Sequence, residues 1–287
     1  MVVQLTDGKI KLSYGDIEML ADELEETMGI TVDDNDCVDS SVITVEELQR
    51  LQIKYYAANH WYPLLHDKDI TMNSILVPLT KDQINNIIAK RDCPEFLQYI
   101  KQVNNNKVSN SGVNNKVFVK LGSVSPKDTS SLTAMTSQQI VNILASSPRV
   151  VSNLTNPDWP NQYLFLRDYW SFVPSSPEFR VFVTGRRCVA ISQDNFVECG
   201  QSPDTIKAEI VKFCSKVIDL LWYEDCTIDV VYCSAKLRYY LIEINTPYYL
   251  IAGTALYNLD VDSDRGILSG LHYNEFGTDI RFPSSWF

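Results

Sequence analysis

Two segments near the C-terminal end constrain the fold most, 226–232 (CTIDVVY) and 237–245 (LRYYLIEIN). Both are rich in β-branched and aromatic residues, which is typical of strands, and a short turn near 234–236 would join them into a hairpin. If the turn centres near Lys236, Asp229 lies directly opposite Glu243. Asn245 shares their face, because alternate residues of a strand point to the same side.

The chemistry of this face suggests a metal site. Two facing carboxylates repel each other unless a cation lies between them, and Asp229, Glu243 and Asn245 all offer hard oxygen ligands. Magnesium held to nucleotide phosphates is the usual occupant of such a set. The alternative is a pair of acidic residues on a solvent-exposed strand face.

The rest of the chain reads as α+β. Strands are expected at 75–79, 117–121, 163–167, 179–184 and 188–193. A helix is expected over 13–28, and further helices after capping boxes at Thr44–Glu47, Thr80–Gln83 and Thr136–Gln139. Ser202-Pro203 starts another helix, with an apolar face that would cover an antiparallel sheet in the C-terminal part. Residues 33–41 read as a linker, 60–74 mostly as a loop, and 104–115 as an Asn-rich loop.

Several classes are excluded. The glycine-rich loops GxGxxG and GxxxxGK[ST] are absent, which argues against Rossmann and P-loop folds. No run of 18 apolar residues and no secretory signal is visible, so no membrane partner is expected. The 7 cysteines form no CxxC pair and the 3 histidines are scattered, which favours reduced thiols in a cytoplasmic protein.

The net charge of -11 is concentrated at one end. Residues 1–40 hold eleven acidic and two basic residues, whereas the other 247 residues carry 25 acidic and 23 basic ones. We therefore expect an acidic arm (1–40), an N-terminal lobe (41–168) and a C-terminal lobe (169–287). The arm is either a solvated amphipathic helix or an element that docks on a basic partner, and the nearly neutral body is compatible with an anionic substrate.

Two further clusters carry cations. Lys120 interrupts an apolar strand, where a buried lysine is costly unless an anion meets it; its alternative is the polar face of an edge strand. Arg167 is followed by Asp168, Tyr169 and Trp170, and Glu178 and Arg180 share one strand face, suited to an ion pair or a phosphate contact. One lobe that supplies a lysine, a middle segment that supplies an arginine and a final hairpin that supplies acidic residues form the layout of the ATP-grasp fold. That fold holds a nucleotide between two α+β lobes.

At these positions the sequence resembles the cell division cycle protein 123 family, an atypical ATP-grasp group. The resemblance covers about residues 55–247 and rests on five stretches in order, HWYP with ILVPL, VFVKLGSVSPKD, LFLRDYWSFVPSSPEFR, CVAISQ, and the final hairpin. It departs from the family at Asp168-Tyr169, where the family has one lysine, and after Asn245.

The resemblance implies roles for individual residues. Lys120 would contact ATP phosphates, with Ser123 and Ser125 in the same turn. The segment Arg167, Asp168, Tyr169 and Trp170 would border the nucleotide. Glu178, Arg180 and Gln193 would complete the pocket, and Asp229, Glu243 and Asn245 would bind magnesium.

The function implied is ATP-dependent assembly of eukaryotic translation initiation factor 2, as a chaperone that binds its gamma subunit. The alternative is an ATP-dependent ligase, or an enzyme that phosphorylates or adenylates a carboxylate or an RNA end. Catalysis would then depend on Lys120 and Arg180, and the divergent segment 246–287 would select the acceptor. A decayed scaffold is the third option, against which the three metal ligands argue.

Overall fold

The computed structural model describes residues 5–6, 9–10, 55–105, 116–157, 162–171, 173–195, 197–248, 256–257, 261–271, 273 and 277–282. The chain divides into two compact units, residues 50–175, which we call the middle unit, and residues 176–287 together with 1–49. We call the described part of 176–287 the C-terminal unit. The predicted helix 13–28, the linker 33–41, the capping box at Thr44–Glu47 and most of the Asn-rich loop lie outside the described residues. Near the N-terminus, β1 (Leu5–Thr6) pairs with β2 (Lys9–Ile10).

The middle unit is built on a four-stranded antiparallel sheet in the order β3-β6-β4-β5. Its strands are β3 (Ser74–Pro78), β4 (Val117–Leu121), β5 (Thr133–Ala134) and β6 (Tyr163–Asp168). Three of these were predicted, each to within one residue at either end. Because β4 lies between β6 and β5, Lys120 is on an inner strand, and the edge-strand alternative is wrong.

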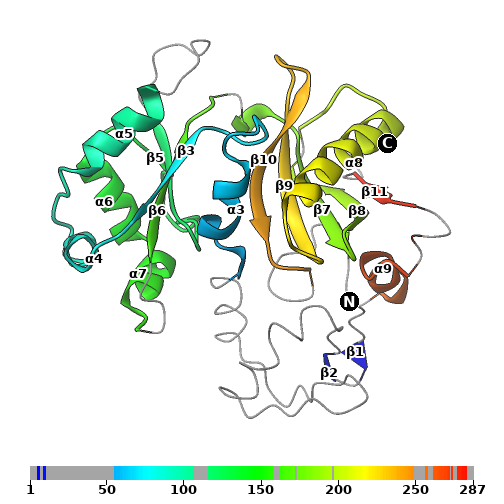
Figure 1. Cartoon of the computed structure of the whole chain (residues 1–287), viewed down its shortest axis with the longest axis horizontal. Helices are drawn as coiled ribbons and strands as arrows, with labels where there is room; N and C mark the ends of the chain where they lie inside the picture. Colours follow the sequence, from blue (N-terminus) through cyan, green and yellow to red (C-terminus); the bar gives the residue numbers. More distant parts are fainter. Residues whose placement is uncertain are drawn as a thin grey trace. The chain divides into compact units, whose positions relative to one another are not determined.

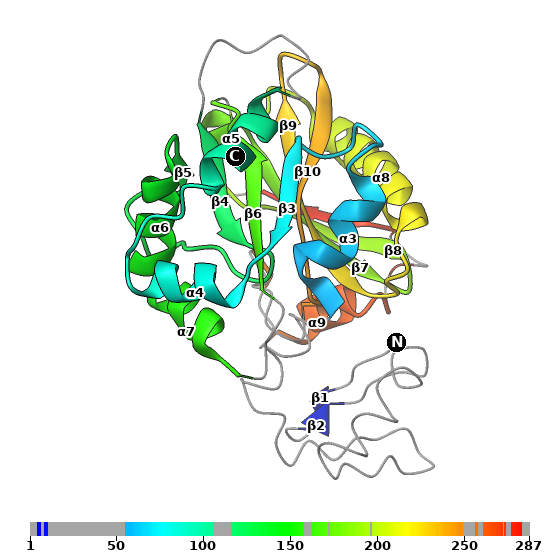
Figure 2. The ribbon, with the colours of Figure 1, turned by 60° about the vertical axis from the view of Figure 1, so that its left-hand side comes forward.

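Four helices cover one face of this sheet (Figures 1 and 2). They are α4 (Lys81–Ile88), α5 (Phe96–Asn105), α6 (Ser137–Ser146) and α7 (Pro148–Thr155). Their apolar residues share one core with Val117, Val119 and Leu121 of β4. Alternation along β4 therefore turns Lys120 to the opposite face.

The predicted capping boxes at Thr80 and Thr136 are confirmed, since each threonine side chain accepts from the backbone of a glutamine that reaches back. Helices α5 and α7 were not predicted from the sequence. For α7 the signal was present, because Ser147-Pro148 repeats the cap and first-turn proline of Ser202-Pro203.

The predicted loop after residue 60 is wrong, because α3 spans Ala58–Leu65. Pro63 lies inside this helix and removes a backbone donor, which normally argues against a helix. However, Ala58, Trp61, Tyr62 and Leu65 are all buried, and this spacing forms one continuous apolar helix face. Packing of that face therefore outweighs the local effect of the proline.

The C-terminal unit contains a five-stranded sheet in the order β10-β9-β7-β8-β11. Its strands are β7 (Glu178–Thr184), β8 (Arg187–Gln193), β9 (Cys226–Cys233), β10 (Arg238–Asn245) and β11 (Asp279–Arg281). The first four are antiparallel, as predicted, and β11 adds an unpredicted parallel edge next to β8. A short 3-10 helix, η2 (Val173–Ser175), precedes the sheet.

The predicted helix α8 (Pro203–Leu220) packs on one face of this sheet (Figure 1). It buries Ile206, Ile210, Cys214, Val217 and Ile218. On the other face, beside β8, Phe182 and Ala190 pack with Tyr248, Tyr257 and Leu268, the last from α9 (Asp262–Leu268). The remainder of that second face carries the polar residues described below.

The hairpin of β9 and β10 pairs Asp229 with Glu243, as predicted, but by a different route. The turn sets Arg238 opposite Cys233, a register that would place Ile242 across from Asp229. A β-bulge between Leu241 and Glu243 then moves the pairing on by one residue. The bulge is what brings both carboxylates to the same face.

Candidate functional site

A row of polar residues crosses the second face of the five-stranded sheet. Strand pairing aligns Ser192 of β8 with Arg180 of β7, Arg180 with Asp229 of β9, and Asp229 with Glu243 of β10. Asn245 lies next to this row, two residues beyond Glu243. The three metal ligands predicted from the sequence are thus brought together, and none is on a freely solvated face, since Asp229 lies on an inner strand and its side chain is 16% exposed.

Arg180 binds Asp229 through two parallel hydrogen bonds. Arg180 Nε donates to Oδ1 of Asp229 at 2.8 Å and Nη2 donates to Oδ2 at 2.8 Å. Asn245 Nδ2 donates to the same Oδ2 at 3.0 Å. This bidentate arrangement is the strong form of an arginine–carboxylate pair, and it fixes both side chains.

Burial and charge act in opposite directions on this pair. Burial lowers the pKa of Arg180 and is the largest single effect, but the hydrogen bonds with Asp229 and the negative charges of Asp229, Asp194 and Glu243 together outweigh it and raise the pKa. Burial raises the pKa of the Asp229 carboxyl, with help from the charge of Glu243, while the Arg180 guanidinium opposes the rise. With two bonds of 2.8 Å between them, both groups are charged at neutral pH.

The ligand types fit magnesium, because two carboxylates and an amide group converge on one face and magnesium prefers oxygen ligands. Within the described residues, no group of three or more His, Cys, Asp or Glu side chains is arranged to hold a metal ion, so Asn245 would have to complete the set. Its carbonyl oxygen remains for that role, since its amide nitrogen donates to Asp229. The protein's own cation, Arg180, already neutralises Asp229.

Two other predicted pocket residues differ in their placement. Glu178 shares the face of Arg180, two residues earlier on β7. Gln193 pairs with Phe179 and therefore belongs to the opposite face of the sheet, where its Nε2 donates to the carbonyl oxygen of Val197 at 2.6 Å. The structure does not bring Gln193 together with Arg180 and Asp229.

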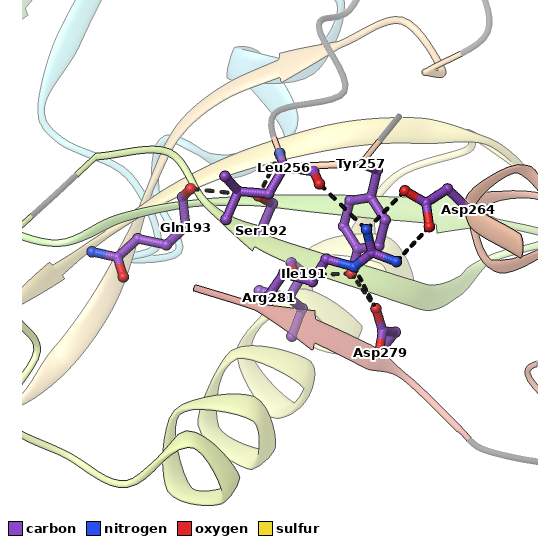
Figure 3. A network of polar contacts seen from close by, with 8 residues as sticks. All are labelled: Ile191, Ser192, Gln193, Leu256, Tyr257, Asp264, Asp279 and Arg281. Carbon is purple, nitrogen blue, oxygen red and sulfur yellow. Dashed lines mark hydrogen bonds and ion pairs between the residues drawn. The ribbon is translucent and has the colours of Figure 1, made fainter. Parts of the chain in front are cut away.

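A polar network around Arg281 holds strand β11 on the face of the sheet that carries Arg180 and Asp229 (Figure 3). The Arg281 guanidinium donates to both carboxylate oxygens of Asp264, at 2.8 and 2.6 Å, and stacks 4.1 Å from the ring centre of Tyr257. The Tyr257 hydroxyl lies 2.8 Å from Asp279 Oδ2. Beside it, the backbone amide of Leu256 donates to Ser192 Oγ at 3.1 Å, which ties this segment to the neighbour of Arg180.

In the middle unit, the face of the sheet opposite the helix-covered core carries Lys120 and Arg167. Lys120 pairs with Phe165, and Arg167 follows two residues later on the same face of β6. Both cationic side chains are 5% exposed. Two cations held on one face of a sheet form a ready contact for an anion.

Aromatic side chains surround Arg167 on this face. Phe165 lies under its guanidinium at 5.0 Å and packs edge-to-face against Trp61 and Tyr62 of α3. Arg167 Nε donates to Ser74 Oγ at 3.3 Å. The low exposure of the face would strengthen any charge interaction made there, because little water screens it.

The remaining predicted residues of this unit lie around the strand ends. Ser123 Oγ donates to Asn153 Oδ1 of α7 at 3.1 Å, and Ser125 Oγ is buried with no hydrogen-bond partner in the described part of the chain. Asp168 faces away from Arg167, at the last position of β6, and its Oδ2 accepts from Trp170 Nε1 at 3.0 Å. Tyr169 lies between Asp168 and Trp170 in the sequence, beyond the end of β6.

The comparison with known families settles where the chain belongs. The model of the D123 family matches residues 80–260, which include the predicted site residues from Lys120 to Asn245. The chain is a member of the D123 family. This confirms the resemblance found in the sequence.

Relatives of the D123 family agree with this assignment. A protein described as CDC123-like from Acanthamoeba polyphaga mimivirus is 25% identical over 206 residues, which covers 67% of this chain and 63% of that protein. The chain therefore spans less than two thirds of the length of this relative. Cdc123 from Schizosaccharomyces pombe superposes with a TM-score of 0.61 at 22% identity, over 85% of this chain and 99% of that structure.

The fold agrees as well. The match to Cdc123 confirms the α+β, ATP-grasp-like class expected for a D123 protein, with two sheets.

Two further predictions concern the whole chain. The six described cysteines are all free thiols, as expected. None of the helices in the described ranges is long and apolar enough to span a membrane.

Some residues of the polar faces were not anticipated. Ser74 contacts Arg167, and Ser192 contacts the Leu256 backbone. Nothing in the local sequence distinguishes these two residues from other strand serines. Thr227, which pairs with Asn245, is fully buried, and its hydroxyl has no hydrogen-bond partner among the described residues. It could have been found only by extending the hairpin register two pairs beyond Asp229 and Glu243.

Proposed function

We propose that this D123 protein binds ATP with magnesium and uses it to assist assembly of eukaryotic translation initiation factor 2. The observation that carries the nucleotide part is the row of Arg180, Asp229 and Glu243, with Asn245 beside it. Magnesium-bound phosphates need oxygen ligands on one side and cationic donors on the other, and this protein has both kinds of group at low exposure.

Each group has a distinct role in this proposal. Asp229, Glu243 and Asn245 hold the magnesium. Lys120 and Arg167 neutralise phosphate oxygens, and the aromatic surroundings of Arg167 exclude water from those contacts. Bound magnesium lowers the repulsion between the phosphates and the two carboxylates, so the nucleotide should bind far better with the metal than without it.

Calorimetric titration with ATP tests the nucleotide part. Wild-type protein should bind ATP in the presence of magnesium and lose most of that affinity in EDTA. Lys120→Met should weaken binding, whereas Lys127→Met, which removes an exposed lysine of the following loop, should not. Absence of ATP binding by the wild type would refute the proposal.

The assembly role rests on family membership and needs its own test. Purified gamma subunit of initiation factor 2 should be retained by the immobilised D123 protein, more strongly with magnesium-ATP. Retention that is absent with and without ATP would refute an assembly role. Release of ADP, AMP or pyrophosphate in the presence of amino acids, peptides or RNA ends would instead favour the ligase-type alternative.

A further inference from the structure

The Asp229 carboxylate is already nearly saturated by groups of the protein itself. A carboxylate offers about four lone-pair sites to hydrogen-bond donors or metals. Arg180 uses one site on each oxygen, and Asn245 uses a second site on Oδ2. With respect to the residues that the structure describes, one site, on Oδ1, remains.

The charge of Asp229 is also compensated. Its pairing with Arg180 takes place at low exposure, 14% for the arginine side chain and 16% for the aspartate. At this exposure little water screens the guanidinium charge, so it repels a second cation that approaches the same carboxylate. Glu243 lies across from Asp229, yet by itself it provides one carboxylate where a magnesium site needs more ligands.

We propose that Arg180 and a divalent cation compete for Asp229, so that Arg180 must release Asp229 before the hairpin can hold the metal. This inference rests on the proposed magnesium site and specifies how it is controlled. Arg180 acts as the internal counter-ion of Asp229 when no metal is bound. Once released, its planar guanidinium is free to bind a phosphate oxygen, the other anion for which its geometry is suited.

The exchange has a consequence for affinity. Metal alone gains Asp229 only by breaking the two bonds of 2.8 Å that Arg180 makes with it, and so binds weakly. Metal that arrives with a nucleotide gives the released guanidinium a new anionic partner. Metal and nucleotide should therefore each strengthen the binding of the other, by the same factor.

Manganese binding without nucleotide tests the competition, read by the electron paramagnetic resonance of free Mn²⁺. Arg180→Met removes the competitor and should bind Mn²⁺ at least tenfold more tightly than wild type. Arg180→Lys keeps the positive charge but cannot form two parallel bonds, so it should also gain affinity, to a smaller extent. Arg187→Met is the matched control, because Arg187 is an exposed arginine of the neighbouring strand β8, and it should bind as wild type does.

Two additional measurements keep the result decisive. Circular dichroism melting shows whether each variant is folded. If Arg180→Met is not folded, Arg180→Lys is compared with the wild type in its place. In the double variant Arg180→Met/Asp229→Asn the gain should vanish, since the extra affinity belongs to Asp229. A gain that persists in the double variant would place the metal elsewhere and overturn the inference.

The release of Arg180 can be followed directly by NMR. The Nε–H resonance of Arg180 is identified by its loss in Arg180→Lys, and saturating Mg²⁺ should shift or broaden it in the wild type. Metal binding that leaves this resonance unchanged, or folded Arg180 variants without any gain in Mn²⁺ affinity, would overturn the competition. If instead the wild type fails to bind ATP, the proposed function is refuted, while the Mn²⁺ comparison still decides the exchange.

Discussion

The two sheets share one design but differ in the charge of their polar faces. Each sheet is covered by helices on one side and carries predicted site residues on the other. In the middle unit these residues are Lys120 and Arg167, set among aromatic rings. In the C-terminal unit they are Asp229, Glu243 and Asn245, gathered around a single arginine.

This difference indicates a division of tasks. The cationic face offers guanidinium and ammonium groups, which are hydrogen-bond donors suited to phosphate oxygens. The acidic face has to exchange its own cation before it can take a metal. The middle unit should therefore contribute contacts to phosphate, and the C-terminal unit should contribute the ligands of the metal.

The largest effect is expected from Asp229→Ala. This change removes the Asp229 carboxylate from Arg180, whose side chain is 14% exposed, and breaking a pair at such low exposure costs roughly 3 kcal/mol of stability. Metal-dependent ATP binding should be lost as well. Urea unfolding and calorimetry measure the two effects.

The double variant Arg180→Met/Asp229→Leu provides the control for Asp229→Ala. It removes both charges and should be less destabilised than Asp229→Ala, because no uncompensated charge remains. If Asp229→Ala were as stable as wild type, the paired bonds with Arg180 would not stabilise the fold, and the contrast between the two faces would lose its basis.

The next effect concerns Lys120→Met in the middle unit. The methionine fills a similar volume at a position that is 5% exposed, so the variant should remain folded. ATP affinity should fall at least tenfold, or about 1.4 kcal/mol. Mn²⁺ binding without nucleotide should not change, and a change there would contradict the division of tasks.

The sequence alone predicts those parts of the two polar faces that depend on local pattern. Lys120 interrupts the alternation of Val117, Val119 and Leu121, which pack in the helix-covered core, so its face follows from strand geometry alone. The capping boxes at Thr80 and Thr136 likewise depend on residues within a single turn.

The hairpin shows where local pattern is not enough. Asp229 and Glu243 were predicted to pair from a turn centred near Lys236, but the actual turn is offset from that register and a bulge at Ile242 restores it. No residue type in this segment predicts that bulge. The prediction reached the correct pair because the two deviations compensate each other.

Contacts between distant strands were the least predictable. Arg180 and Asp229 are 49 residues apart, and their pairing depends on the order of β7 and β9 in the sheet. The sequence predicted a metal as the cation near Asp229, whereas the order of the strands places an arginine there. In the same way, Gln193 was grouped with Arg180 although its pairing with Phe179 assigns it to the other face.

The smallest effect separates stability from binding. Thr136→Ala removes the hydroxyl that accepts from the Gln139 amide at 3.2 Å, and losing such a cap costs about 1 kcal/mol. Urea unfolding should detect this loss, with Ser130→Ala, an exposed serine nearby, as the unaffected control. Because α6 packs on the helix-covered face of its own sheet, Mn²⁺ binding at Asp229 should remain at the wild-type level. A parallel loss of Mn²⁺ affinity would mean that the cationic and the acidic face are energetically coupled, and that the tasks of the two units cannot be assigned separately.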